Sequence, residues 1–367
     1  MKNLIVASLL AVLAVTGFSS CSEDFTVTAP YRQVTVVYGI LDQKDSSHYI
    51  RIQKAFLDEN KSAIDMAKDA DSSFYKNLDV TILEYNNART QVLKTASLYR
   101  VDLNKEGYQK DHAETEQQFF SDVNYAYKFK NTDMQLNPQN WYQLLIKNKD
   151  IGRTDSSEFI GIVNSDSLKE NHGFYVSQFT LSEYKLSFSR TTPSSTYKLN
   201  VLLPRNSRML EGIIRFHYVD KNALTGQQTD KYVDYSFDSK IASTPEQVGF
   251  NFELSALNSS IYAFLNASIG TPGNNIERYM DSCTMIVYAA SPEILFFNQI
   301  NLGQSGGITG DNIQPTYTNF KSKDVIGVIG SRAKRTYYNA AIDDVTLDSL
   351  MANPTTLPLN IRGRSDH

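Results

Sequence analysis

Histidine and cysteine, the side chains that most often hold zinc, are scarce in this sequence: its 367 residues include five histidines and two cysteines. The histidines show no H-x-x-H or H-E-x-x-H spacing, and C-x-x-C does not occur. These absences exclude a zinc site encoded by local spacing, and only a site assembled across strands stays open. Two cysteines cannot build a disulfide framework, so the chain must rely on its own core, which its length permits. We expect no cofactor.

Motifs for phosphate binding and nucleophilic catalysis are also missing. Neither the Walker pattern nor G-x-G-x-x-G occurs. Residues 303–307 satisfy G-x-S-x-G, but a nucleophile elbow needs a strand before the serine, a helix after it and a histidine further along the chain. The preceding segment predicts a helix, and the only later histidine is His367, the final residue. We therefore predict a glycine-rich loop there and assign no catalytic residue.

An excess of positive charge is absent as well. The chain has 36 Lys and Arg against 40 Asp and Glu, which gives a net charge of −4. Nucleic-acid-binding domains carry a basic patch or stripe. The only tight basic cluster, Arg332, Lys334 and Arg335, is typical of a solvated loop or strand edge. The composition therefore excludes nucleic acid as a partner.

What the sequence does have at its start is a leader. Lys2 supplies a positive charge, and residues 4–15 supply an apolar run that is followed by small residues. A membrane span needs about 20 apolar residues, so this run is too short to be one. Residues 1–20 are therefore predicted to be a removed signal peptide.

Cys21 follows Ser19 and Ser20 directly, and this arrangement resembles the lipobox of bacterial lipoproteins. The resemblance implies that the thiol is acylated and that Cys21 becomes the new N-terminus. The alternatives are a secreted protein with an incidental thiol, or pairing with Cys283, which would add little structure at a chain end. With Cys21 lipidated, Cys283 is expected to be a small core residue.

Ser22, Glu23 and Asp24 come next, and this acidic step resembles the export signal of Bacteroidota lipoproteins on the outer face of the outer membrane. It implies a protein that is anchored to the membrane by its N-terminal lipid and exposed at the cell surface. Residues 21–31 then form a polar tether. A lipid-anchored protein that faces the periplasm is the alternative.

Strand-forming residues dominate the rest of the chain, which has 22 Tyr and 19 Phe but one Trp. Residues 33–41 and 48–56 flank a polar turn and predict a hairpin. In the second strand Tyr49, Arg51 and Gln53 share one face, which favours a sheet with one wet face. The further strand-like runs are 78–85, 97–103, 119–129, 141–147, 159–163, 197–203, 212–219, 232–237 and 324–332.

Helix signals are few. Residues 60–71 have the spacing of a short helix, residues 254–265 place apolar side chains on one helical face, and Ser291 with Pro292 predicts a helix start. The pattern favours a mainly β protein of two sandwich-like antiparallel β domains with a few short helices. We expect the N-terminal β domain over 32–190, the C-terminal β domain with helical insertions over 191–352, and a loose tail over 353–367.

Four segments carry a resemblance to a family: VVYGILD, YIRIQKAFL, YTNF and GVIGSR. Together they resemble an uncharacterised family of Bacteroidota outer-membrane lipoproteins, and the resemblance spans nearly all of the mature chain. It implies the location and a β-sandwich fold. It transfers no catalytic residue.

Aromatic side chains offer one candidate binding site. Tyr125, Tyr127, Trp141 and Tyr142 could form a platform on which sugar rings stack, or they could be one face of a core. We therefore expect a non-catalytic binding or assembly module for glycan or nutrient capture, with a glycan or an outer-membrane protein as partner. The alternative is a cell-envelope hydrolase, directed at glycan or peptide, whose site is not recognisable from sequence.

Overall fold

The computed structural model describes residues 33–55, 63–110, 121–168, 172–177, 185–188, 195–303 and 317–363. Cys21, Ser22, Glu23 and Asp24 lie outside these residues, so their lipidation and export roles stay predictions. The described part is mainly β, as the sequence predicts. It contains a 14-stranded mixed sheet, a three-stranded antiparallel sheet and few helices.

The first half of the chain supplies eight strands of the large sheet. These are β1 (Thr35–Asp42), β2 (Ser47–Lys54), β3 (Leu78–Tyr85), β4 (Val92–Asp102), β5 (Tyr125–Lys130), β6 (Trp141–Asn148), β7 (Arg153–Ser156) and β8 (Ile160–Gly161).

The second half supplies the other six strands of the large sheet and all of the small one. The large sheet receives β10 (Lys185–Leu186), β12 (Met209–Asn222), β13 (Gln228–Ser236), β14 (Lys240–Ile241), β16 (Ile276–Ala290) and β17 (Val325–Ile342). The small sheet consists of β9 (Tyr175–Val176), β11 (Thr196–Leu202) and β15 (Asn251–Leu257).

The predicted N-terminal hairpin is confirmed: β1 and β2 pair antiparallel around a polar turn. In β2 the buried side chains His48, Ile50 and Ile52 alternate with the half-buried Tyr49 and Arg51. One face of the hairpin therefore packs in the core and the other meets solvent, as the alternation predicts.

The large sheet is mixed rather than wholly antiparallel, which corrects the predicted fold class. Its main order is β13-β12-β16-β17-β1-β2-β5-β4-β3-β6-β7. β17 pairs parallel with β1, from Thr35 opposite Val325 to Asp42 opposite Arg332, and antiparallel with β16. This pairing joins the two ends of the described chain into one continuous sheet, and no local sequence pattern records it.

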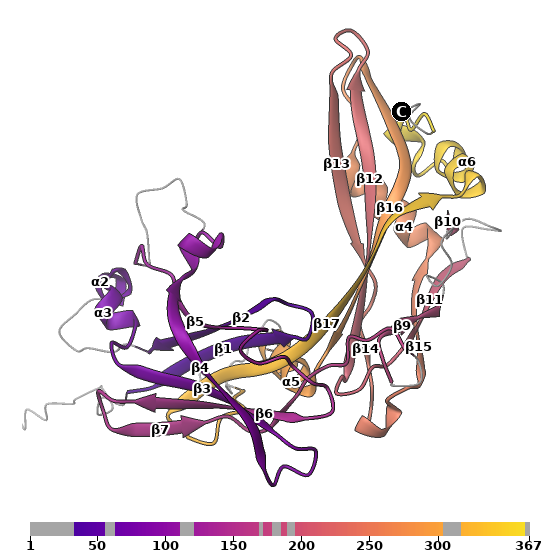
Figure 1. Cartoon of the computed structure of the whole chain (residues 1–367). Coiled ribbons are helices and arrows are strands. Elements are labelled where there is room, and N and C mark those ends of the chain that lie inside the picture. The colour runs from indigo at the N-terminus through magenta and orange to yellow at the C-terminus, as the bar shows by residue number, and fades with distance from the viewer. Residues whose placement is uncertain are drawn as a thin grey trace, which may run out of the picture.

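Two large hydrophobic cores lie along this sheet, besides a small cluster of Met209, Ala290 and Leu295. The first contains Ile50, Ile82, Phe129 and their neighbours, and it draws Ile329 from β17. The second core packs the C-terminal strands and helices, and it draws Ala333, Ala340 and Ile342 from the same strand β17. Figure 1 shows the resulting shape: β1 to β7 form the limb at the left, β12, β13 and β16 rise at the right, and β17 runs between the two limbs.

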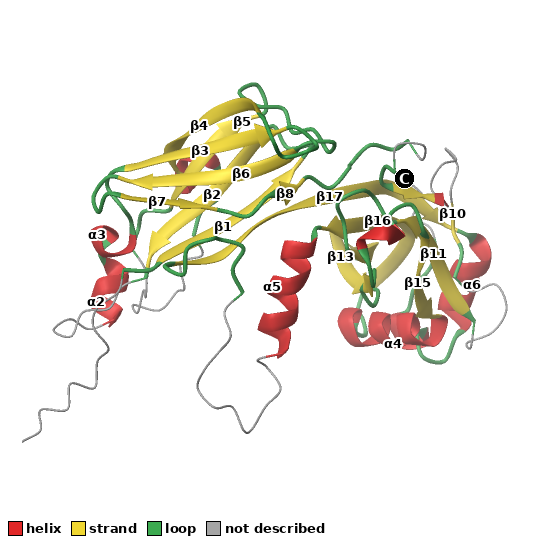
Figure 2. Ribbon diagram, turned by 90° about the horizontal axis from the view of Figure 1, so that it is seen from below, coloured by secondary structure: helices red, strands yellow, loops and turns green. Residues whose placement is uncertain are grey.

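Helices occupy the margins of the sheets. They are α2 (Ala63–Lys68), α3 (Ala70–Ser73), α4 (Asn258–Ile269), α5 (Pro292–Gly303), α6 (Asp344–Ala352) and the 3-10 turns η1 (Leu103–Glu106), η4 (Pro245–Gln247) and η5 (Leu357–Leu359). Figure 2 shows α5 beside β17 and α4 and α6 around the other limb.

Two helix predictions have different outcomes. The helix start at Ser291 and Pro292 is confirmed, and Ser291 Oγ accepts a hydrogen bond from the Ser331 N–H at 3.1 Å, which attaches the helix to β17. The apolar spacing predicts a helix that includes Leu254, and for this residue the prediction is wrong. Leu254 lies in β15 opposite Leu199 of β11, and the helix begins only at Asn258.

Residues 353–363, part of the tail for which the sequence predicts loose structure, pack against the second core. Leu359 and Ile361 are buried there, and the Arg362 N–H donates to the Arg278 carbonyl at 2.8 Å. Buried apolar side chains and backbone hydrogen bonds together hold this segment against the second core.

Candidate functional site

The aromatic side chains singled out in the sequence do not form an exposed platform. Tyr127 and Tyr142 are buried in the first core, so neither ring can stack on a ligand. The Tyr142 hydroxyl donates to Glu84 Oε1 at 3.1 Å and accepts from the Asn137 N–H at 2.6 Å. These are the contacts of a satisfied core tyrosine.

The other two aromatic residues are half-buried and already covered by neighbours. The Arg89 guanidinium lies 3.6 Å from the ring centroid of Trp141. The Tyr125 ring has Phe74 at its edge and Arg100 over it, with centroid distances of 5.3 Å and 4.6 Å. These contacts cover the two rings, so Trp141 and Tyr125 do not present a common face on which a ligand could stack.

A pocket of about 670 Å³ lies elsewhere, on the solvent side of β2. We call it the β2–η1 pocket. Its walls include residues of the β1–β2 turn, of β2, of the segment around η1 and of β17, and the side chains used below are Asp45, Tyr49, Arg51, Tyr108, Lys110, Asn124 and Arg332.

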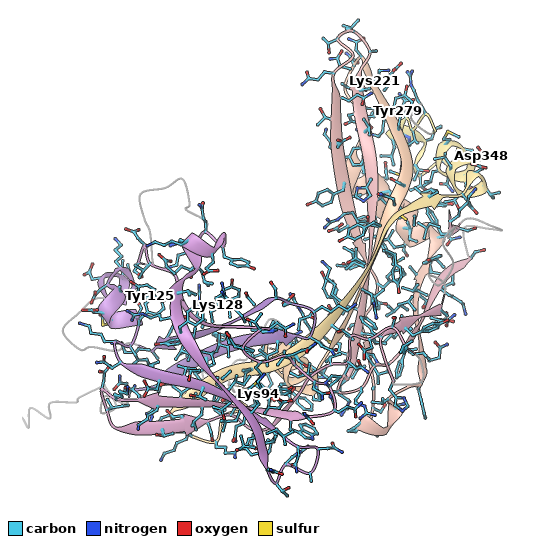
Figure 3. The ribbon with its side chains drawn as sticks, viewed as in Figure 1. Lys94, Tyr125, Lys128, Lys221, Tyr279 and Asp348 are labelled. Atoms are coloured by element: carbon cyan, nitrogen blue, oxygen red, sulfur yellow. The ribbon has the colours of Figure 1, made fainter. Side chains whose placement is uncertain are left out.

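Strand alternation supplies the floor of the β2–η1 pocket. Tyr49 and Arg51 point away from the core because their neighbours His48, Ile50 and Ile52 point into it. Arg332 reaches the same side from β17, at the register position opposite Asp42. Figure 3 labels Lys128 on β5, the strand next to β2 in this limb, far from Lys221 and Tyr279 in the other limb.

The segment after β4 supplies the wall. The Asp102 carboxylate caps η1 by accepting from the Asn104 N–H, and Gly107 ends the turn in the left-handed region at φ 91°. A glycine adopts this conformation without the penalty of a side chain. The chain then reverses, with the Tyr108 N–H donating to the Leu103 carbonyl at 2.9 Å, and so places Tyr108 and Lys110 at the pocket.

Asn124 connects floor and wall. Its side-chain oxygen accepts a hydrogen bond from Arg51, and its side-chain NH₂ donates to the Tyr108 carbonyl at 3.0 Å. The Lys110 ammonium donates to the carbonyls of Ser121 and Val123 at 2.6 and 2.7 Å. These hydrogen bonds from Arg51 and Lys110 go to neutral oxygens and help to fix the positions of the two cationic groups.

Burial and mutual repulsion act on these cations. Burial lowers the pKa of Arg51, and burial together with the positive charge of Arg51 lowers the pKa of Lys110. The positive charges of Arg51 and Lys110 therefore repel one another in a partly desolvated space.

A second set of polar contacts borders the pocket. The Glu106 carboxylate accepts from Lys128 Nζ at 2.5 Å and from the Tyr49 hydroxyl at 2.9 Å. The hydrogen bond to Glu106 raises the pKa of Lys128 to about 12, and the same contact lowers the pKa of Glu106. This carboxylate is thus neutralised by its own lysine. The Tyr108 ring meets Tyr49 edge-on at 5.5 Å and is itself 57% exposed.

His48, which also borders the pocket, belongs to the core. Its ring is 1% exposed and stacks on Phe129 with centroids 4.5 Å apart. Neither ring nitrogen has a hydrogen-bond partner in the described structure. Burial lowers its pKa, so the neutral ring is the favoured form.

Sequence reasoning missed most of this pocket. The alternation in β2 did place Tyr49 and Arg51 on a wet face, but nothing indicated that η1 returns over them. Lys110 lies between two predicted strands, in a stretch with no predicted element, and Arg332 belongs to a basic cluster typical of a solvated loop or strand edge. Their approach depends on chain reversal at Gly107 and on the β1–β17 pairing, both of which are tertiary features.

The remaining candidate sites add no catalytic group. Within the described residues, no group of three or more His, Cys, Asp and Glu side chains is placed to hold a metal ion. Gly303 ends α5, and the other residues of the G-x-S-x-G match lie outside the described part. Cys283 is confirmed as a core residue: its free thiol is fully buried in β16, and burial raises its pKa to about 12.

Comparison with known proteins adds no further assignment. No protein-family model matches the chain, and a search of curated proteins gives no significant match. No helix within the described ranges is both long enough and apolar enough to cross a membrane.

Proposed function

We propose that this protein is a lipid-anchored outer-membrane protein that captures a small polar ligand in the β2–η1 pocket and does not transform it. The observation that carries the proposal is the pocket itself. Its volume of about 670 Å³ falls within the usual range of ligand sites, about 300–1,000 Å³. Its donors are already fixed in position by Asn124 and by backbone carbonyls, so a ligand would find them pre-organised.

The chemistry of the lining supports binding over catalysis. A general acid or base works best with a pKa near the operating pH. The charged donors here are two arginines and a lysine, and the guanidinium group keeps its proton throughout the physiological range. His48 turns its ring into the core, where it stacks on Phe129. Among the described residues of this pocket Asp45 is the one carboxylate, so the alternative of a cell-envelope hydrolase would lack the second carboxylate that glycoside hydrolysis uses.

The anchor rests on the sequence. The lipobox resemblance at Cys21 and the acidic step over Ser22, Glu23 and Asp24 support attachment to the outer membrane with the folded part at the cell surface. Two acyl chains suffice for stable anchoring. A Cys21→Ala protein should move from the membrane fraction to the soluble fraction in the native host, and unchanged membrane association would contradict the anchor.

We further propose that the two large cores correspond to two β domains with β17 as the strand they share. The boundary between them lies near residues 162–163 and not at the predicted 190/191, because Val163, Phe174 and Leu186 pack in the second core. The separate cores support this division.

Ligand capture can be tested with a panel of neutral and acidic mono- and disaccharides, sugar phosphates and dicarboxylates. At least one compound should raise the melting temperature of the full chain, because a ligand that binds only the folded state stabilises it. Tyr108→Ala should abolish the shift by removing an exposed ring from the wall. Tyr338→Ala is the control, since Tyr338 is 74% exposed on β17 and does not line the pocket. An equal shift in all three proteins would place binding elsewhere and contradict the proposal.

A further inference from the structure

The described lining of the β2–η1 pocket carries a net positive charge, whereas the whole protein carries a net negative charge. Among the described residues, the charged lining of the pocket consists of Arg51, Lys110 and Arg332 against one carboxylate, Asp45. The whole chain has a net charge of −4. Three cations at one pocket of an acidic protein are therefore a local feature, and they do not follow from overall composition.

Acids outside the lining offset this charge only in part: Asp102 and Asp122 act on Lys110, and Asp42 acts on Arg332. Glu106 is held by Lys128 and by the Tyr49 hydroxyl, so that ion pair is neutral as a unit. Arg51 and Lys110 instead donate to amide and carbonyl oxygens, which carry no formal charge. Burial and, after it, the positive charge of Arg51 lower the pKa of Lys110, while Asp122 and Asp102 act in the opposite direction.

The donors also suit one kind of acceptor. A guanidinium presents a planar fork that matches the oxygens of a carboxylate or phosphate, and a lysine adds a point charge. Arg51 and Arg332 approach from different strands, β2 and β17, and Lys110 from the wall. The exposed Tyr108 ring adds an apolar surface for the body of a ligand.

We propose that the β2–η1 pocket selects ligands that carry an oxyanion, a carboxylate or a phosphate, and holds that group among Arg51, Lys110 and Arg332. This inference rests on the proposed function and names the ligand class of the same site. The binding is electrostatic, so it weakens as ionic strength rises and surface charges are screened.

The experiment compares matched ligands on the full chain by isothermal titration calorimetry. Glucuronate and glucose differ in a carboxylate against a hydroxymethyl group, and inorganic phosphate supplies an oxyanion without a sugar. Glucuronate should bind at least tenfold more tightly than glucose. Phosphate alone binding as tightly as glucuronate would support the oxyanion site and identify phosphate as sufficient. Weak phosphate binding with tight glucuronate binding would support a site for an acidic sugar.

Three variants localise the effect. Arg51→Gln and Arg332→Gln should each weaken glucuronate binding about tenfold or more and reduce its salt dependence. Arg332→Gln is the safer test of the two, because Arg51 also supports Asn124. Lys94→Gln is the matched control, since Lys94 is an exposed cation on β4 outside the pocket.

The outcomes separate this inference from the proposed function. If glucose binds as tightly as glucuronate and Tyr108→Ala abolishes both, the pocket captures ligands but has no oxyanion preference, and only this inference fails. If anions bind equally well to the parent, Arg51→Gln and Arg332→Gln proteins, they bind elsewhere and the inference fails. If neither glucuronate nor phosphate binds, the inference is overturned, and a shift with any neutral compound in the saccharide panel would still support capture.

Discussion

His48 shows how a single side chain near the pocket can serve the fold rather than the site. Its ring stacks on Phe129, and both ring nitrogens are buried without a hydrogen-bond partner in the described structure. A buried polar group without a partner costs about 1–3 kcal/mol. Burial favours the neutral ring and lowers its pKa, and the negative charge of Asp45 opposes this shift only in part.

The pH dependence of the stability follows from the lowered pKa of His48. A base whose pKa is lower in the folded protein contributes stability that is complete above its unfolded pKa, about 6.5, and is lost as the pH falls below that value. His48→Phe keeps the stack and removes the two nitrogens. It should raise the free energy of unfolding by about 1 kcal/mol at pH 7 and by more at pH 5. Urea denaturation at both pH values measures this, and an equal loss of stability from pH 7 to pH 5 in the variant and the parent would contradict it.

At the scale of single residues, sequence patterns predicted burial better than function. Cys283 was expected in the core and lies there. Tyr127 and Tyr142, which the sequence presents as candidates for a ligand platform, are core residues, because aromatic residues in a strand pack inward as readily as they face solvent. Which of the two occurs depends on the strand that pairs alongside, and that partner is not visible in a local pattern.

The connection between the two limbs of the sheet depends on β17, and Gly327 is the most constrained position of this strand. Gly327 has φ 110° and lies opposite Val37 of β1 in the parallel pairing. A Cβ at this position would meet the Val37 carbonyl oxygen at 2.0 Å. Backbone atoms cannot move aside as the end of a side chain can, so only glycine fits here.

Gly327→Ala should therefore destabilise the protein by about 3 kcal/mol or more, through the clash and the backbone strain together. Gly273→Ala is the matched control, because its φ is not positive and a Cβ there would meet nothing within 4 Å. The control should stay within about 0.5 kcal/mol of the parent. Chemical denaturation compares the three proteins, and two variants of equal stability would show that β1 and β17 are not packed as described.

Single elements followed the sequence where their signals are local. The β1–β2 hairpin, β3 and the start of α5 could be predicted because alternation, turn residues and a serine–proline helix start act over a few residues. The parallel β1–β17 pairing could not, since it joins segments near opposite ends of the chain. The β2–η1 pocket also depends on the β1–β17 pairing, because its lining includes residues of β2 and Arg332 of β17.

At the scale of the whole molecule, one strand connects two cores. β17 gives Ile329 to the first core and Ala333, Ala340 and Ile342 to the second. The sequence predicts two β domains that divide at 190/191, whereas the two large cores of the described residues exchange segments across that boundary: Phe174 and Leu186 pack in the second core and Ile329 in the first. What the sequence could not show is that a single mixed sheet continues through both. A ligand that contacts Arg332 therefore touches the strand shared by the two cores.

The central claim is that an anionic ligand binds between β2, the η1 segment and β17. Hydrogen–deuterium exchange of the full chain with saturating glucuronate tests this most directly, because amide protection reports which backbone segments a ligand stabilises. We predict added protection in Ser47–Lys54, in residues 103–110 and around Arg332, and little change in β12, β13 and β16. Protection confined to those three strands, or no protection at β2 under conditions where calorimetry shows binding, would contradict the account.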